Sequence, residues 1–282
     1  MSAVFCRRTE VKSTPRSIAP RKGMARARPP AITARMTEFL TTPQGRKLAY
    51  NRSDGTGPGV VFLGGFKSDM QGSKALFLHD WAQSQGRAFL RFDYTGHGQS
   101  SGDFDDGCIG DWAADATAAI EALTTGPQIL VGSSMGGWIA LLLARAMPAR
   151  IAGLVGIAAA PDFTTITWNE ELTEAQRAEV TATGRVEIPS DYADNPYIFT
   201  AKLFDDGAKN RVLDRPLALP VPSRFLQGTA DTDVLPEVAL RLLDHATGPD
   251  IRLTLVKGAD HRFSSPTCLA LIAQALAEVT AP

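Results

Sequence analysis

Residues 127–145 read PQILVGSSMGGWIALLLAR, and this stretch decides the fold that the sequence predicts. Its first part, Pro127–Val131, is a short apolar run typical of a buried strand. Its last part, Gly137–Arg145, is an uninterrupted helix-forming run. Between them, residues 132–136 match the pattern G-x-S-x-G. A strand, a tight turn and a helix around that pattern hold a serine hydroxyl clear of the backbone, so Ser134 is the candidate nucleophile.

The two glycines of this turn, Gly132 and Gly136, are expected to let the strand and the helix approach closely. We expect any Cβ at these positions to collide with the neighbouring strand and helix. The alternative is a turn of small residues without chemistry, and the position between a strand and a helix disfavours it.

Apolar runs and helical patterns alternate along the rest of the chain. After an early antiparallel strand at Lys47–Ser53, the sequence predicts further strands at Gly59–Leu63, Arg87–Asp93, Ile151–Ala158, Ser223–Gln227 and Ile251–Val256. It predicts helices at Ser73–Gln85, Ile109–Leu123, Pro236–Ala246 and Pro266–Val279. In the first helix, we expect an inward stripe formed by Leu76, Phe77, Asp80, Trp81 and Ser84. This order predicts the α/β class, with a mostly parallel sheet covered by helices on both faces.

One stretch, 161–222, is longer than an ordinary connection. It contains Trp168, a polar helical run at Glu170–Thr183, and the apolar residues Tyr197, Ile198 and Phe199. We interpret it as an inserted lid, because ligands of such sheets bind beyond the carboxyl ends of the strands. Trp168 and the residues Tyr197, Ile198 and Phe199 are candidates for lining an apolar acyl pocket, with local packing as the alternative. A surface excursion without a substrate role is the alternative.

The charge is divided unevenly between residues 1–35 and the rest of the chain. The first part holds nine Lys and Arg against the single acid Glu10, and it has no apolar periodicity. The totals of 29 basic and 30 acidic residues therefore leave 20 basic and 29 acidic residues in 36–282. We expect residues 1–35 to be a disordered leader, either a transit peptide or the product of a misassigned start upstream of Met36. The acidic domain at 36–282 argues against nucleic acid as a partner.

The four histidines narrow the choice of a base for Ser134. His79 and His245 fall inside predicted helices, and His97 lies in a glycine-rich turn. His261 follows the predicted strand Ile251–Val256, at its carboxyl end. This position satisfies the chain order serine, acid, histidine that a G-x-S-x-G hydrolase uses, so His261 is the predicted base.

The acid is expected between Ser134 and His261, after a late strand. Two candidates follow Gly228: Asp231 is preferred and Asp233 is the second choice. Asp260 adjoins the histidine in sequence, and a sequence neighbour rarely directs its carboxylate at the next ring. The acid would fix the imidazole tautomer and stabilise the imidazolium.

An oxyanion hole needs two backbone N–H groups directed at the developing negative charge. One is expected from Met135, which follows the nucleophile. The other is expected from Phe66, in the turn after the strand Gly59–Leu63. Gly64 and Gly65 precede it and allow the amides to turn toward the substrate.

Three cysteines, Cys6, Cys108 and Cys268, suggest neither a disulfide framework nor a metal cluster. The sequence therefore predicts no metal and no cofactor. A reducing compartment, the cytoplasm, is the expected location, with mitochondria as the alternative if residues 1–35 are a transit peptide. No apolar run is long enough for a membrane span, so stable membrane insertion is not expected.

Several motifs together resemble a known family. The stretches 62–70, 91–98, 126–138 and 260–262 are similar to the α/β-hydrolase branch of mitochondrial acyl-glucuronide esterases and palmitoyl-protein thioesterases. The similarity extends from about Thr37 to the C-terminus and is weakest in the lid. It implies the α/β-hydrolase fold and a triad of Ser134, Asp231 and His261. It also implies hydrolysis of acyl esters or thioesters without a cofactor.

The sequence thus predicts a serine hydrolase that acts on small-molecule or acylated substrates through an acyl-enzyme, as a monomer or small homo-oligomer. A peptidase or carbon–carbon bond hydrolase uses the same groups and stays open as an alternative. So does a ligand-binding homologue whose triad is inactive.

Overall fold

The computed structural model describes residues 37–189 and 196–280. The chain divides into two units, residues 1–35 and residues 36–282. The leader predicted at 1–35 lies outside the described residues, and so does the tip of the segment at 190–195. Among the helices that the structure describes, none combines the length and the apolar character needed to cross a bilayer.

The second unit is built on one eight-stranded sheet with the order β1-β2-β4-β3-β5-β6-β9-β10. Its strands are β1 (Glu38–Thr41), β2 (Lys47–Ser53), β3 (Gly59–Leu63), β4 (Phe89–Phe92), β5 (Gln128–Ser133), β6 (Ile151–Ile157), β9 (Ser223–Gly228) and β10 (Ile251–Val256). Pairs β1–β2 and β2–β4 are antiparallel, and the pairs from β4 through β10 are parallel. The prediction of a mostly parallel α/β sheet is confirmed.

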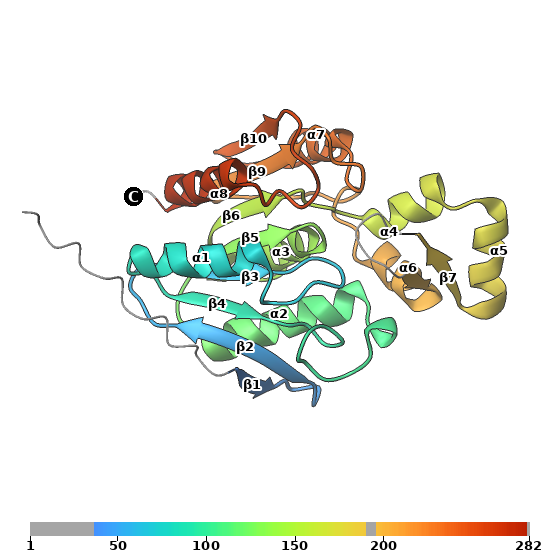
Figure 1. Ribbon diagram of the computed structural model, residues 1–282, viewed down its shortest axis with the longest axis horizontal. Helices are drawn as coiled ribbons and strands as arrows, with labels where there is room; N and C mark the ends of the chain where they lie inside the picture. The colour runs from blue at the N-terminus through green and yellow to red at the C-terminus, as the bar shows by residue number, and fades with distance from the viewer. Residues whose placement is uncertain (1–36, 190–195, 281–282) are drawn as a thin grey trace, which may run out of the picture. The chain divides into compact units, whose positions relative to one another are not determined.

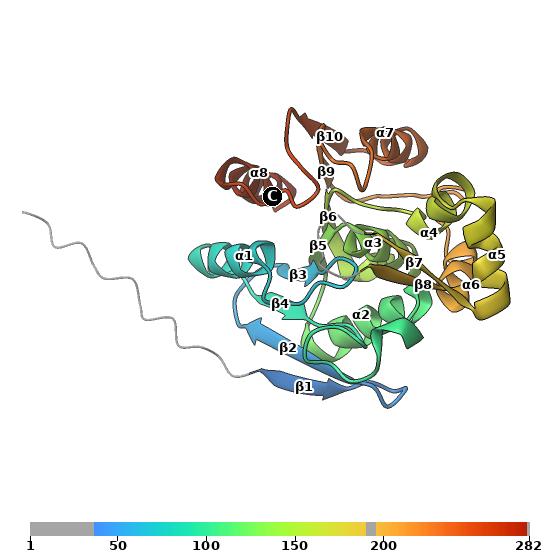
Figure 2. The same ribbon diagram turned by 45° about the vertical axis from the view of Figure 1, so that its right-hand side comes forward.

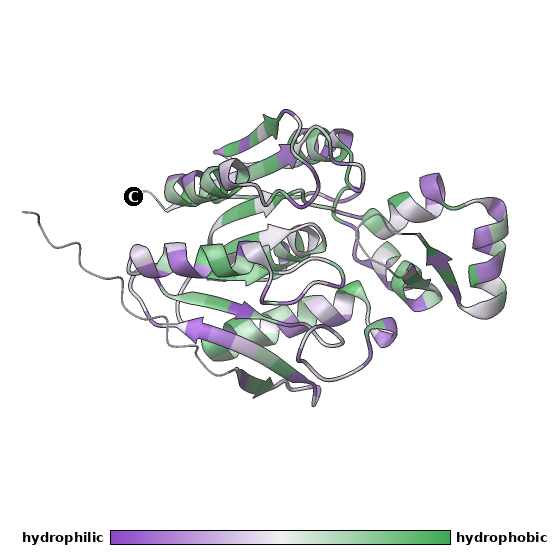
Figure 3. Ribbon diagram, in the orientation of Figure 1, coloured by the Kyte–Doolittle hydropathy of each residue, from purple (hydrophilic) through white to green (hydrophobic). Residues whose placement is uncertain are grey.

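Helices cover both faces of this sheet, as Figure 2 shows. Helices α1 (Ser73–Ser84) and α8 (Pro266–Val279) pack on one face, and α2 (Ile109–Leu123) and α3 (Met135–Ala146) on the other. Helix α7 (Pro236–His245) packs against β9 and β10. Every residue of β3 and β5 is buried, which explains why these strands are nearly continuous apolar runs. In Figure 3 the neighbouring strand β6 is also coloured as hydrophobic, whereas much of the outer helix α5 is coloured as hydrophilic.

The expected inward stripe of α1 is wrong. The buried residues of this helix are Ala75, Leu78 and Ala82, whereas Leu76 is 41% exposed. The spacing of three and four residues between the buried positions is helical, but two of them are alanines. Small side chains let α1 lie close to the sheet, so the larger apolar residues mark the flanks of its buried face.

The segment between β6 and β9 forms a separate group of elements on the right of Figure 1. It comprises α4 (Phe163–Ile166), the π-helical turn Thr167–Glu171, α5 (Glu174–Thr183), the antiparallel pair β7 (Arg185–Ile188) and β8 (Tyr197–Thr200), and α6 (Ala201–Lys209). Short 3-10 turns elsewhere are Phe104–Asp106 and Pro148–Arg150.

The polar run Glu170–Thr183 is not one helix, as the sequence suggested. Glu170 belongs to the π-helical turn, and α5 begins only at Glu174. Thr173 caps α5 through its hydroxyl, which accepts from the Gln176 amide, while the Gln176 side chain accepts from the Thr173 amide. At the start of a helix the first backbone N–H groups have no acceptor within the helix. The reciprocal pair of Thr173 and Gln176 supplies two such acceptors, so a new helix starts here.

Polar contacts fix the base of this segment to the rest of the fold. The carboxylate of Asp206 in α6 accepts the Gly110 amide at the start of α2 at 2.6 Å. Lys202 of α6 donates to the carboxylate of Asp111 at 2.8 Å. Within the segment, the buried Asp162 carboxylate accepts the amides of Val212 and Leu213 and so joins its beginning to its end. These bonds place the segment beyond the carboxyl ends of the strands.

Candidate active site

The predicted site residues come from four different strands and meet at one edge of the sheet. Phe66 follows β3, Ser134 follows β5, Asp231 follows β9 and His261 follows β10. Because these strands run parallel, their carboxyl ends lie together, and so do the turns that follow them.

Ser134 lies in the strained turn that the sequence predicted between β5 and α3. Its backbone has φ 53° and ψ −119°, which is unusual for a residue with a side chain. The structure holds it there with three backbone hydrogen bonds. The Ser134 amide donates to the Ile157 carbonyl at 2.9 Å, and the Ser134 carbonyl accepts the amides of Gly137 at 2.8 Å and Ala160 at 3.1 Å. The strain therefore serves to project the hydroxyl.

The flanking glycines are required by close backbone contacts. A Cβ on Gly132 would lie 2.3 Å from the Gly136 carbonyl oxygen. A Cβ on Gly136 would lie 2.1 Å from the Leu63 carbonyl oxygen at the end of β3. The expected collision with helix and strand is thus present at both positions.

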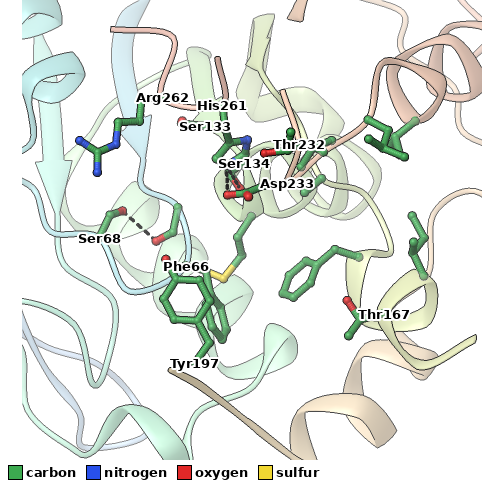
Figure 4. A pocket seen from close by; sticks show the side chains of 18 of the residues that line it. Phe66, Ser68, Ser133, Ser134, Thr167, Tyr197, Thr232, Asp233, His261 and Arg262 are labelled. Atoms are coloured by element: carbon green, nitrogen blue, oxygen red, sulfur yellow. Dashed lines mark hydrogen bonds and ion pairs between the residues drawn. The ribbon is translucent and has the colours of Figure 1, made fainter. Parts of the chain in front are cut away.

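His261 lies between Ser134 and Asp231 (Figure 4 shows its ring beside Ser134). Its Nε2 is 3.1 Å from the Ser134 Oγ, and its Nδ1 is 3.0 and 3.1 Å from the two carboxylate oxygens of Asp231. A carboxylate only accepts, so Nδ1 carries the proton and donates to Asp231. In the neutral ring Nε2 is then the acceptor, and it faces the serine hydroxyl.

Asp231 is buried, and its charge is satisfied by donors other than His261. The amides of Asp233 and Val234 donate to Oδ1 at 3.0 and 2.9 Å, and the Gln227 side chain donates to Oδ2 at 2.9 Å. Burial raises the pKa of the Asp231 carboxyl, but the hydrogen bonds from His261, Val234 and Gln227 outweigh it and hold that pKa below its ordinary value. The carboxylate is therefore ionised at neutral pH.

Gln227 is a site residue to which the sequence did not point. It is fully buried, and its amide donates both to Asp231 and to the Val234 carbonyl at 2.8 Å. The available signal was a polar side chain at the end of the apolar strand β9, four residues before the acid. A buried amide in such a place needs partners, and here it orients the carboxylate.

Asp233, the second choice for the acid, lies on the other side of the ring. Its Oδ2 is 4.0 Å from His261 Nε2, the nitrogen that faces Ser134. The bond to Nδ1 is made by Asp231. The structure therefore brings both aspartates to the histidine, but at opposite nitrogens.

The other three histidines are engaged elsewhere in the fold. His97 is buried against the rings of Tyr94 and Trp112, and burial lowers its pKa to about 4. The Nε2 of His245 bonds the Arg215 carbonyl at 2.7 Å, and His79 packs on Phe89. Of the four, His261 is the one bonded to Ser134.

The two residues expected to supply the oxyanion-hole amides belong to turns that lie close to the serine. Met135 is the first residue of α3, where the backbone N–H has no acceptor within the helix. The turn before Phe66 comes close to the nucleophile, since a Cβ on Gly65 would lie 3.4 Å from the Ser134 Cβ. The Ser68 hydroxyl fixes this turn by donating to the Gly65 carbonyl at 2.8 Å.

The Phe66 ring is the centre of an aromatic cluster, which joins the turn to the segment between β6 and β9. Its centroid is 5.6 Å from that of Phe163, 5.7 Å from Tyr197 and 5.3 Å from Phe199. It also packs on Phe104 at 4.7 Å. The residue that carries one candidate oxyanion amide is thus held by side chains of β8 and α4.

A cavity of about 1000 Å³ opens beside Ser134 and His261. Its apolar wall includes Phe66, Phe163, Ile166, Ile188, Tyr197, Phe199, Leu235 and Val238. The volume is at the upper end of the range for pockets that enclose small-molecule ligands.

The sequence expectation for the aromatic residues of this segment is partly wrong. Tyr197 and Phe199 line the cavity, whereas Trp168 packs on Phe204 with the centroids 5.0 Å apart. Ile198 alternates with Tyr197 and Phe199 along β8, so it lies on the opposite face of the strand.

Lys74 is a second residue that the sequence did not single out. It lies in the first turn of α1, lines the cavity, and donates to the Arg262 carbonyl next to His261. Burial lowers its pKa to about 8. The bond ties the loop of His261 to α1.

A family model described as serine aminopeptidase, S33 (Hydrolase_4) matches residues 58–265 of the chain. This range covers the elements β3 to β10 and each of the site residues above. The chain belongs to this α/β-hydrolase family. The prediction of a hydrolase is confirmed.

Several known α/β-hydrolases are similar to it over most of their length. The human palmitoyl-protein thioesterase ABHD10, mitochondrial, is 34% identical over 83% of this chain and 76% of its own. The structure of a putative hydrolase from Agrobacterium vitis S4 superposes with a TM-score of 0.84, at 40% identity over 87% of this chain and 99% of the other. That of mouse α/β-hydrolase domain-containing protein 10 gives 0.80, at 31% identity over 86% and 98%. These likenesses confirm the resemblance inferred from the motifs.

Proposed function

We propose that the protein cleaves acyl esters and thioesters with Ser134 as nucleophile, His261 as base and Asp231 as the acid that orients the base. The observation that carries the proposal is the 3.1 Å separation of the serine hydroxyl from an imidazole whose other nitrogen is bonded to a buried carboxylate. A serine hydroxyl is a weak nucleophile, and a base with a fixed tautomer is what activates it.

In this mechanism His261 takes the serine proton as Oγ attacks the acyl carbonyl. The amides of Phe66 and Met135 donate to the oxygen that becomes negative. The protonated ring then gives its proton to the leaving alcohol or thiol, and water releases the acyl group from Ser134 in a second round. No cofactor enters these steps.

The cavity favours an apolar acyl group. Aromatic and aliphatic side chains of α4, β7 and β8 form the wall next to the serine. The thioesterase name of the relatives at 34% identity supports a thioester as well as an ester. We propose that residues 161–222 act as a lid over the acyl chain, since the segment supplies that wall.

A peptidase is the second candidate, because the matching family model is described as a serine aminopeptidase. The same serine, histidine and aspartate would attack an amide. Aminoacyl p-nitroanilides compared with p-nitrophenyl esters of matched size separate the two candidates.

A chain-length series of p-nitrophenyl esters and acyl thioesters, run beside Ser134→Ala, tests the main proposal. We expect turnover by the natural chain and a loss of about 10⁴-fold or more in the variant. Fluorophosphonate should label the natural chain and not the variant, whereas an inactive ligand-binding homologue would not be labelled at all. Equal turnover of a good substrate by both proteins would contradict the mechanism.

Cellular placement is a separate proposal. The curated mammalian relatives carry "mitochondrial" in their names, which supports the alternative in which residues 1–35 act as a transit peptide. Nothing in the comparisons supports the cytoplasm. A fluorescent fusion of the whole chain, imaged in eukaryotic cells beside one that begins at Met36, distinguishes the two locations.

A further inference from the structure

A second carboxylate lies on the serine side of the His261 ring. Oδ2 of Asp233 is 4.0 Å from Nε2, and that nitrogen is 3.1 Å from the Ser134 Oγ. The side chain of Asp233 is 35% exposed and lines the cavity, whereas that of Asp231 is fully buried behind the ring. Figure 4 shows Asp233 beside Ser134 and His261.

We propose that Asp233 positions the water that releases the acyl group from Ser134. This inference rests on the proposed function, because it assigns a role within the acyl-enzyme step. A distance of 4.0 Å is too long for a direct hydrogen bond, but a water about 2.8 Å from each atom spans it. The two acceptors then subtend roughly 90° at the water, which is close to the angle between its O–H bonds.

In the acyl-enzyme, Nε2 can accept a hydrogen bond from such a water. Once Oγ carries the acyl group, it has no proton to donate to His261. One O–H of the water donates to Nε2 and the other donates to Oδ2 of Asp233. The oxygen lone pair is thereby directed away from both acceptors, toward the acyl carbon on Ser134.

The atoms balance without any further reactant. The water oxygen bonds to the acyl carbon while its proton moves to Nε2, and the carbonyl electrons move to the oxygen held by the Phe66 and Met135 amides. The carbonyl then re-forms, the bond between the acyl carbon and Oγ breaks, and the proton passes from Nε2 to Oγ. Asp233 keeps its hydrogen bond throughout and neither gains nor loses a proton. The carboxylic acid product ionises, and the negative charge of Asp233 then repels it.

The backbone of Asp233, and not its side chain, contacts the carboxylate of Asp231. Its amide donates to Oδ1 of Asp231 at 3.0 Å, a bond that does not involve its side chain. Replacing the side chain of Asp233 therefore leaves the bonds of Asp231 to His261 intact. The substitution Asp233→Asn removes the charge at nearly constant volume.

The test separates acylation from deacylation. The ester that performs best in the chain-length series is mixed with the protein, and intact mass spectrometry follows the formation of acyl-Ser134. After the ester is removed, its decay is measured. We expect Asp233→Asn to slow the decay about 10-fold, because the neutral amide oxygen is a weaker acceptor than the carboxylate and the amide nitrogen does not accept, while acylation changes less than about 3-fold. Asp244→Asn, at an exposed position of α7, is the matched control and should change neither rate.

Competition with methanol gives a second readout. Methanol has one O–H and gains nothing from a second acceptor, so the natural chain should favour water over it. In Asp233→Asn the ratio of methyl ester to free acid should rise about 10-fold. Equal slowing of both steps, an unchanged decay, or an unchanged product ratio would overturn the role of Asp233. If the natural chain neither turns over the ester nor is labelled by fluorophosphonate at Ser134, the proposed function itself fails, which is a different result.

Discussion

The rings of Phe66 and Phe199 pack with their centroids 5.3 Å apart and their planes at 32°. Phe66 carries a candidate oxyanion amide after β3, and Phe199 belongs to β8, more than a hundred residues later. The contact therefore links the turn next to Ser134 with the segment that forms the cavity wall. If the Phe199 ring is displaced, the Phe66 ring and with it the Phe66 backbone amide are expected to shift.

Substitution of Phe199 by leucine tests this link. We expect kcat toward a good ester to fall by about 10-fold, because a donor worth 10²–10³-fold would be displaced but not removed. The free energy of unfolding should fall by only about 1 kcal/mol, since leucine still fills most of the site. Phe39→Leu, at a 46% exposed residue of β1, is the control. A kcat that matches the natural value in a folded Phe199→Leu protein would show that the rings are not coupled to the amide.

Replacing Asp231 by asparagine should lower kcat by about 10⁴-fold, because the amide no longer fixes the tautomer of His261. Steady-state kinetics with one ester measure this loss. Asp233→Asn should cost far less, since Asp233 lies at the other nitrogen. The reverse order of the two effects would assign the acid to Asp233.

Asp231→Asn should also change how the free energy of unfolding depends on pH. The pKa of Asp231 is lower in the folded chain than its ordinary value near 3.8, chiefly through the bonds from His261, Val234 and Gln227, which outweigh burial. Such a carboxyl contributes stability above the unfolded pKa and loses it as pH falls through the folded pKa. The free energy of unfolding, measured by urea titrations between pH 6 and pH 3, should therefore fall more steeply with decreasing pH for the natural chain than for Asp231→Asn. Parallel curves would contradict the bonded carboxylate.

The lowered pKa of Lys74 predicts that the free energy of unfolding changes with pH in the alkaline range. Burial lowers its pKa to about 8 from 10.5, so between these values the unfolded chain binds more protons. The free energy of unfolding of the natural chain, relative to Lys74→Met, should rise as the pH increases from about 8 to about 10. Denaturant titrations at both pH values measure the difference, with the exposed Lys257→Met as control. A constant difference would mean that Lys74 is solvated.

Alanine at Gly136 should prevent folding to the native state. Its Cβ would lie 2.1 Å from the Leu63 carbonyl oxygen, which is a backbone atom of the fully buried strand β3. Gly86→Ala is the comparison, since Gly86 has φ +64° and open space around it, and should cost about 1–2 kcal/mol. Soluble yield and thermal melting distinguish the two variants. A stable Gly136→Ala protein would contradict the close approach of turn and strand.

Much of the fold could be predicted because its central strands, β4, β3, β5 and β6, are buried on both faces. The buried strand at Gly59–Leu63 has the predicted bounds, and so do the helices at Ile109–Leu123 and Pro266–Val279. The stripe of α1 was missed, because a periodicity of large apolar residues does not reveal that alanines face the sheet. The break before α5 was missed as well, since a capping threonine inside a polar run resembles any other polar residue.

The sequence by itself determined the strand–turn–helix around Ser134 and the position of His261 after a strand, because local patterns of glycine and apolar residues fix these elements. Only the tertiary structure decided that Asp231 and Asp233 lie at opposite nitrogens of one ring. It also decided that Gln227 orients the acid and that β8 packs on Phe66. These contacts join parts of the chain whose relative direction depends on how the loops leave the sheet. No local pattern of residues encodes that direction.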